Sequence, residues 1–334
     1  MNISTNLLLT LSLCVAGLPI AKMANAQEDR PLEVVVFPGG FNWPIFVAQK
    51  QELFAAEGIS VNITPTPDSK TQMVGLIDGK FDIAMTAIDN VIAYSEGQGA
   101  APTQKIPDIF AFMGSDSGFL SVVAVPEVKT YSDLKGKKIG VDALTTGYAF
   151  ALRKMLIDKG IEPSDIEFVQ AGGVSKRFEA LMKKEIAATL LVSPFEAAAS
   201  QQGFTVLGAT STSLGAYQGV VAAARRDWTK ANEGKVKQYV RAYRQALNWL
   251  YDPNNKQAAI GILRKNLPDM SEPLAQTTYN VLLDSSSGFF KDAAIDRAGV
   301  AKVLELRSEF AEPKKQLGGP EKYYDMSYYQ AASK

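Results

Sequence analysis

Side chains that could hold a small molecule follow short apolar runs at several points of the chain. The loop PGGFNWP comes directly after the apolar run VVVF, and it offers the amide of Asn42 between the rings of Phe41 and Trp43. Amides, hydroxyls, carboxylates and ring faces hold a solute through hydrogen bonds and stacking. The candidate binding residues are Phe41, Asn42, Trp43, Thr86, Asp89, Asn90, Thr145, Thr146, Gly147, Tyr148, Ser193, Tyr217 and Gln218.

Each candidate also has a purely structural interpretation. Asn42 would cap the following helix, Gly39 and Gly40 would only make the turn, and Trp43 would belong to the core. The position of the loop at the carboxyl end of a strand favours the binding interpretation. Asp89 could accept a hydrogen bond from a ring N–H or an amine of a ligand, and a role in a helix cap explains it equally well.

The same helix-start pattern occurs twice, as TAID from Thr86 and as SPFE from Ser193. In each, a hydroxyl residue followed three positions later by an acid predicts a capping box, and Pro194 suits the first helical position. Free N–H groups at such helix starts can bind a ligand. Asn90 lies deeper in its first turn and is a weaker candidate.

Further candidates lie in the second half of the chain. The residues from Thr145 to Tyr148 begin a helix directly after a strand, where they either cap it or bind a ligand. Tyr217 and Gln218 enter a later apolar run, and the Tyr could simply pack there. The segment Ser115–Ser117, which contains Asp116, is weaker still.

The residue inventory excludes the commonest catalytic routes. The chain has no His, and its single Cys, Cys14, lies in the N-terminal apolar segment. A Ser-His or Cys-His nucleophile and a zinc site made of those ligands are therefore excluded. The 35 basic and 35 acidic residues balance, which argues against nucleic acid as a partner. No metal or other cofactor is expected.

The elements that would position these residues alternate between strands and helices. The first half predicts strands at VVVF, ISVNI and FDIAMT, with helices over 44–56 and 69–77 and a third helix from TAID. The second half repeats the order, with strands at KKIGV, IEFVQ and AATLLV and helices over 145–159 and 175–184. This alternation predicts parallel βαβ units and an α/β fold.

The repeated order predicts two similar lobes. The apolar runs FLSVVAVP and YQGVVAAA are placed to cross between them as a hinge, and amphipathic helices beyond Asp227 would pack back on the first lobe. The expected organisation is a signal peptide over 1–26, lobe I over 27–120, lobe II over 121–218, and a return to lobe I with C-terminal helices and tail over 219–334.

The signal peptide is predicted from an apolar run, Leu7–Ile20, followed by the small-x-small pattern of Ala24 and Ala26. Cleavage is expected after Ala26. The run is shorter than the roughly 20 residues that span a bilayer, which disfavours a membrane anchor.

The combination of FVAQKQELFAAEGISVNI, LIDGKFDIAMT, SDLKGKKIGV and LRKMLIDKGI resembles the periplasmic solute-binding proteins of ABC importers in the sulfonate, nitrate and thiamine-precursor group. WLYDPNNKQAAIGIL and VLELRSEF are similar to that group as well. The resemblance implies a type II periplasmic-binding fold whose lobes close on one solute, in a periplasmic, monomeric protein that delivers it to a membrane permease. Family members commonly use the loop corresponding to Thr145–Tyr148 for ligand binding.

The predicted cleft loops contain no Arg or Lys, the nearest being Lys176 and Arg177. This favours a flat aromatic or heterocyclic solute, such as a pyrimidine vitamin precursor, over a sulfonate, taurine or nitrate. Two other classes stay open. A pyrimidine-synthesising enzyme is disfavoured, since that related chemistry depends on a His and pyridoxal phosphate, and a sensor domain would need a membrane receptor as partner.

Overall fold

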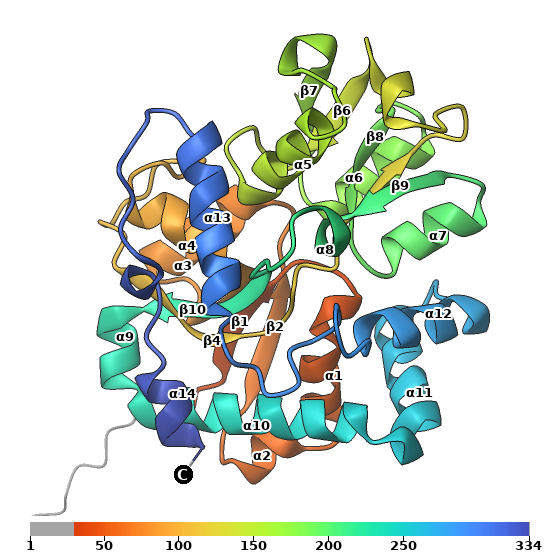
Figure 1. Cartoon of the computed structure of the whole chain (residues 1–334). Helices are drawn as coiled ribbons and strands as arrows, with labels where there is room; N and C mark the ends of the chain where they lie inside the picture. The colour runs from red at the N-terminus through yellow and green to blue at the C-terminus, as the bar shows by residue number, and fades with distance from the viewer. Residues whose placement is uncertain (1–29, 334) are drawn as a thin grey trace, which may run out of the picture. The chain divides into compact units, whose positions relative to one another are not determined.

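The fold is built on two five-stranded sheets (Figure 1). The structure is a computed structural model that describes residues 30–333. The chain from Pro31 onward forms one compact unit. The strands of the first sheet are β1 Leu32–Val36, β2 Val61–Pro65, β3 Ile83–Ala87, β4 Ile109–Gly114 and β10 Val220–Arg225. Those of the second sheet are β5 Ser121–Ala124, β6 Lys138–Val141, β7 Glu167–Gln170, β8 Ala188–Leu191 and β9 Thr205–Ala209.

The two sheets have the same strand arrangement. Their orders are β2-β1-β3-β10-β4 and β7-β6-β8-β5-β9. In each, three strands pair in parallel and a fourth, β10 or β5, runs antiparallel between two neighbours. The continuous apolar runs of β1 and β3 are largely buried, as expected for parallel strands covered on both faces.

Helices follow the strands in the βαβ order that the sequence predicts. The helices that accompany the first sheet are α1 Trp43–Lys50, α2 Leu53–Ala56, α3 Ser69–Asp78 and α4 Ile88–Ser95. Those that accompany the second are α5 Gly147–Ile157, α6 Val174–Met182, α7 Phe195–Gln201 and α8 Thr210–Ser213. The short 3-10 helices are η1 Gly40–Asn42, η2 Tyr131–Leu134, η3 Pro163–Asp165, η4 Pro253–Asn255 and η5 Pro320–Lys322.

The predicted helix over 44–56 is wrong in one respect, because it is two helices. The chain breaks at Glu52, whose φ of 55° lies in the left-handed region. The second piece, α2, then stacks the ring of Phe54 on that of Tyr239, with centroids 5.5 Å apart. The helix is therefore interrupted next to a tertiary contact between two aromatic rings, and the apolar periodicity of the segment does not reveal this interruption.

The two predicted crossing runs become interior strands of the sheets that they enter. FLSVVAVP contains β5 and YQGVVAAA contains β10, so the connections between the sheets are the segments 115–120 and 210–219. These two connections are tied to each other, since Gly219 N–H donates to the carbonyl of Asp116 at 2.9 Å. Strands β4 and β9 were not predicted; each borders the antiparallel strand of its sheet.

The C-terminal part of the chain is helical, as the amphipathic pattern predicts. Its helices are α9 Arg226–Ala231, α10 Glu233–Tyr251, α11 Lys256–Asn266, α12 Glu272–Leu282, α13 Arg297–Phe310 and α14 Ser327–Ala332. Helices α10 and α11 pack on α1, as expected. Helices α12 and α13 also contact the first sheet's side and in addition reach the second, since α12 contacts both η1 and α7 and α13 contacts both α4 and α5 (Figure 1).

Helix α13 thus touches elements of both sheets. Among the described residues, no helix is long and apolar enough to cross a membrane. The predicted signal peptide, including its cleavage position, lies outside the residues that the structure describes.

Candidate functional site

A buried cavity lies where the carboxyl ends of the strands in the two sheets face each other. The volume of this cavity is about 60 Å³. Segments 37–41 and 87–90, β10 and the connection at 116–119 contribute Phe37, Phe41, Ala87, Asn90, Asp116, Gly118, Phe119 and Val220. The second sheet and its helices contribute Asp142, Thr146, Gly147, Tyr148, Val174, Arg177 and Val192.

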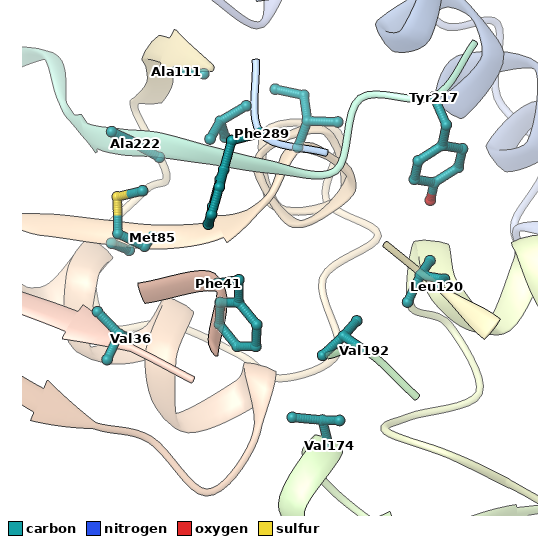
Figure 2. Close-up of a cluster of buried hydrophobic side chains, with 14 of the residues drawn as sticks. Val36, Phe41, Met85, Ala111, Leu120, Val174, Val192, Tyr217, Ala222 and Phe289 are labelled. Atoms are coloured by element: carbon teal, nitrogen blue, oxygen red, sulfur yellow. The ribbon is translucent and has the colours of Figure 1, made fainter. Parts of the chain in front are cut away.

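The lining is mainly apolar and aromatic. Figure 2 shows the ring of Phe41 near Val192 and Val174, which come from the other side of the cavity. Tyr148 lies near Tyr217, with ring centroids 6.3 Å apart and planes at 41°. Burial raises the pKa of both hydroxyls above the usual value, so both stay protonated donors at neutral pH.

Five predicted binding residues line this cavity. They are Phe41, Asn90, Thr146, Gly147 and Tyr148. Asn90 donates to the hydroxyl of Thr86 at 2.9 Å, and Thr146 donates to the carbonyl of Ala143 at 2.9 Å. Thr146 therefore positions the start of α5, although its side chain makes no helix-cap bond.

The other predicted residues lie outside the lining. Asn42 donates to the carbonyls of Phe37, at 2.6 Å, and Gly39, at 3.3 Å. It thereby fixes the loop that carries Phe37 and Phe41. Trp43 is fully buried in the core, where its indole N–H donates to the carbonyl of Ala259 at 3.1 Å.

Asp89 forms a buried ion pair in place of the predicted capping box. Its two carboxylate oxygens accept from Nε and Nη2 of Arg307, each at 2.6 Å, and both side chains are almost fully buried. Helix α4 begins only at Ile88, after Ala87, and has no side-chain cap. The paired, charge-assisted bonds to Arg307 outcompete a single bond to a backbone N–H.

The second predicted capping box is also absent. Helix α7 begins at Phe195 with Pro194 as its N-cap, so Pro194 is not the first helical residue. The hydroxyl of Ser193 donates to the carboxylate of Glu196, and both side chains are buried. This bond satisfies the hydroxyl and Oε1 of the carboxylate, whereas Oε2 of Glu196 has no hydrogen-bond partner.

Thr145, Tyr217 and Gln218 have structural contacts. The carbonyl of Thr145 accepts from Nη2 of Arg307 at 2.8 Å. Gln218 donates to the carbonyls of Asp116 and Val220 and accepts from Asp296 N–H at 2.8 Å, which ties together the connection segments and the start of α13. Tyr217 is buried beside the lining residue Tyr148.

Asp116 is the most unusual polar group of the lining. Its Oδ1 accepts from the N–H groups of Gly118, at 2.9 Å, and Val220, at 3.0 Å, while its Oδ2 is buried and has no hydrogen-bond partner. Burial raises the pKa of this carboxyl to about 6, although the N–H groups of Val220 and Gly118 and the Ser115 hydroxyl favour the ionised form. In the structure the Ser115 hydroxyl is hydrogen-bonded to that of Tyr243, at 2.8 Å.

Arg177 brings a cation to the cavity that the loops alone did not predict. It is buried, and it donates to Thr189 Oγ1, Gly172 O and Leu190 O at 2.8–3.2 Å. These partners are all neutral. Burial lowers the pKa of its guanidinium, and the charge of Asp142, another lining residue, raises it. The pair Gly172-Gly173 lies between β7 and α6 as Gly39-Gly40 lies between β1 and α1, and this repeated pair was a sequence signal for a strand-to-helix loop at the site.

Direct contacts close the cavity around its rim. Gly40 N–H donates to Ser193 O at 3.2 Å, and Gly173 N–H donates to Pro67 O at 3.0 Å. Ser69 N–H, at the start of α3, donates to Asp142 Oδ2 at 3.2 Å. Each bond joins an element of the first sheet to one of the second, so the structure is the closed arrangement of the two.

The arrangement is suited to noncovalent capture of a small solute. It combines ring faces, two carboxylates and one guanidinium in a space largely removed from water, where polar interactions are strong. Among residues 30–333, no group of three His, Cys, Asp or Glu could hold a metal ion.

Solved structures share this fold across most of their length. A ligand-binding component of an ABC-type import system from Staphylococcus aureus has a TM-score of 0.74 at 13% identity, covering 91% of this chain and 99% of that one. The periplasmic nitrate-binding protein of Synechocystis gives 0.71 at 13% identity, covering 92% and 89%. The alkanesulfonate-binding protein of Xanthomonas axonopodis pv. citri bound to MOPS gives 0.67 at 16%, covering 85% and 92%.

These likenesses confirm the predicted fold class, that of the periplasmic binding proteins with two α/β lobes. Comparison with curated proteins finds no match. The family model described as "NMT1/THI5 like" matches residues 42–256, a range that begins in the Asn42 loop and contains all the described strands except β1. The chain is therefore a member of the NMT1/THI5-like family.

Proposed function

We propose that this protein is the periplasmic substrate-binding component of an ABC importer, which captures a small organic solute between its two lobes and presents it to a membrane permease. The observation that carries the proposal is the cavity that both sheets line and that contacts between them close. The chain passes between the two sheets through two short connections, the segments 115–120 and 210–219, an arrangement suited to hinge motion. The solved import-system component supports the same role.

The lobe boundaries belong to this proposal. Residues 27–120 and 219–334 would make up lobe I, and residues 121–218 would make up lobe II. Export would be followed by removal of residues 1–26, and the working form would be a monomer. Mass spectrometry of the protein recovered from the periplasm would test the cleavage, with Gln27 as the expected first residue.

The solute that fits best carries a flat ring. Phe37, Phe41, Phe119 and Tyr148 supply ring faces around the cavity. A ring needs more room than is present, since about 60 Å³ is free here whereas a cavity that admits benzene measures about 150 Å³. The lobes would open to admit a ring and would then close around it slightly further apart than they lie here, with both sides in contact with the ligand.

A small oxyanion is the second candidate, and two observations favour it. Arg177 lines the cavity, and solved proteins of the same fold bind nitrate and an alkanesulfonate. Asp116 and Asp142, which line the same cavity, oppose it by charge repulsion. An enzymatic role has less support, because the chain carries no His.

A ligand screen tests the proposal. Heterocycles, aromatic acids, sulfonates and nitrate would be added to the protein, and the melting temperature would be measured. A ligand at a hundred times its Kd should stabilise the fold by about 2.7 kcal/mol. Val174→Phe, which fills the cavity, should abolish the shift, while Val206→Phe, at a position 45% exposed, should retain it. If no class of solute stabilises the wild-type protein, the proposal is wrong.

A further inference from the structure

The unpartnered oxygen of Asp116 is informative about the solute. The side chain is fully buried, it lines the cavity, and its Oδ1 is held by two backbone N–H groups. Oδ2 is left without a donor. A buried acceptor that lacks a partner is costly, and more so when it is charged, because it has lost its water without gaining a donor.

The charges around the cavity do not supply the missing donor. The guanidinium of Arg177 donates to three neutral acceptors. The carboxylate whose charge raises the pKa of this guanidinium is that of Asp142. The ion pair of Arg307 is with Asp89, which does not line the cavity. Among the described residues, none of the ion pairs involves Asp116.

We propose that Asp116 selects the solute, and that its Oδ2 accepts a hydrogen bond from an amino group or ring N–H of the ligand. This inference rests on the proposed function, because it assigns the solute class of the same cavity. Solutes with an N–H donor bind, and oxyanions or rings without one are rejected. Rejection follows because such a solute would bury the carboxylate without giving Oδ2 a partner.

Asp116→Asn reverses the polarity at this position. The two backbone N–H groups of Gly118 and Val220 require an acceptor, so the amide oxygen takes the place of Oδ1. The amide NH₂ then takes the place of Oδ2 and presents a donor to the cavity. The variant keeps both bonds that hold the connection segments, and only the group offered to the ligand changes.

The experiment uses two matched pairs of probes. 4-Aminobenzoate is compared with benzoate, and taurine with ethanesulfonate, so that within each pair one compound has an N–H donor and the other has none. Dissociation constants would be measured by calorimetry at pH 7.5 for the full-length mature protein, with nitrate included. The wild-type protein should bind the donor compound of at least one pair about 10- to 100-fold more tightly than its partner.

Asp116→Asn should lose that preference or reverse it. Glu196→Gln is the matched control, because Glu196 is also buried, also has an unpartnered oxygen, and does not line the cavity. It should keep the wild-type preference. Binding of the benzoate pair would indicate a ring-bearing amine as the solute, and binding of the sulfonate pair would indicate an aliphatic aminosulfonate.

The outcomes separate this inference from the proposed function. If the wild-type protein binds benzoate, ethanesulfonate or nitrate as tightly as the N–H compounds, or if Asp116→Asn binds them all as the wild type does, the inference is overturned while a solute-binding role stands. If none of the probes binds but the wider screen finds a solute without an N–H donor, the inference falls again. If no solute binds at all, both fall.

Discussion

At the scale of single residues, the pair of Asp89 and Arg307 shows how a side chain suited to ligand binding can be used for structure. The ion pair is bidentate, and Nη2 of Arg307 also donates to the carbonyl of Thr145. One guanidinium therefore joins α13, α4 and the loop before α5. A buried ion pair is costly to break from one side, since the remaining charge is left unpaired.

We expect Arg307→Met to destabilise the fold by about 3–5 kcal/mol, because it leaves the carboxylate of Asp89 buried and unpaired. Urea unfolding would measure the loss. Lys237→Met is the control, since its ion pair with Glu233 has side chains 29% and 57% exposed, and such surface pairs contribute at most about 1 kcal/mol. A loss below 1 kcal/mol for Arg307→Met would contradict the assignment.

Asp116 predicts a pH dependence of stability. Its pKa is raised from 3.8 to about 6 in the folded state, so between these values the folded protein binds more protons than the unfolded chain. The contribution of Asp116 to stability therefore falls as pH rises through this window. Asn does not titrate, so Asp116→Asn should gain stability relative to wild type between pH 4 and pH 7.5, by up to roughly 3 kcal/mol.

Urea titrations of both proteins at the two pH values would check this change. The comparison is between the two proteins at each pH, so other carboxyls with a raised pKa, such as that of Glu196, cancel. If the difference in unfolding free energy between the two proteins stays constant from pH 4 to pH 7.5, the pKa of the Asp116 carboxyl is not raised by folding.

At the scale of elements, the loops that start helices lie at the rim where the sheets meet. Gly173 precedes α6, and a Cβ at this position would lie 2.7 Å from the carbonyl oxygen of Pro67, which is closer than atoms normally approach. Pro67 precedes α3 of the other sheet. The backbone of Gly173, with φ of −60°, is accessible to any residue, so only the approach of the two loops requires Gly.

Gly173→Ala should therefore hinder closure and leave each sheet intact. We expect ligand affinity to fall roughly tenfold, within the 1–3 kcal/mol typical of coupling between conformation and binding. Calorimetry with a ligand from the screen would measure it. Gly234→Ala is the control, because no atom lies within 4 Å of a Cβ added there. Equal affinities for the two variants would refute the role of Gly173 in closure.

The helices were the most predictable elements. The segments from Ser69 and from Glu272 have apolar periodicity, and in the structure the side chains of Asp68 and Ser271 cap these two helices. Strands β4 and β9 were missed, although IFAFMG is a buried apolar run, because no helix directly follows β4 and only the four-residue α8 follows β9, so neither shows a clear βαβ pattern. The break at Glu52 accompanies the packing of Phe54 against Tyr239, residues far apart in sequence.

At the scale of the whole molecule, the contacts between the sheets mean that, in the proposed function, ligand binding and closure would be one event. Bonds such as Gly40 N–H to Ser193 O form only when the two sides meet. A ligand that contacts both sides stabilises this closed form, and an open form would exchange ligand with solvent. A ligand can shift the equilibrium between the open and closed forms only by as much as its affinities for the two forms differ.

Small-angle X-ray scattering would detect this closure. With saturating ligand we expect the protein without residues 1–26 to have a radius of gyration of about 19 Å, the value typical of a compact chain of that length, and a larger value without ligand. Gly173→Ala should reduce the difference between the two states. Identical scattering with and without ligand would contradict closure on binding.

The amino-acid sequence alone determined the α/β class, the doubled order of elements, the amphipathic C-terminal helices and the absence of His-based catalysis, because these depend on local periodicity and residue inventory. It also indicated Phe41, Asn90, Thr146, Gly147 and Tyr148, since strand ends meet at one edge of a sheet.

Only the tertiary structure decided which polar groups remain for a ligand. Asp89 is taken by Arg307, 218 positions away in the chain, and this pairing withdraws a carboxylate that the local pattern offered. Asp116, a weak candidate by sequence, becomes the buried acceptor because Gly118 and Val220 bind only one of its oxygens. Whether a polar atom is satisfied depends on neighbours that folding brings from distant segments, and a local pattern does not contain them.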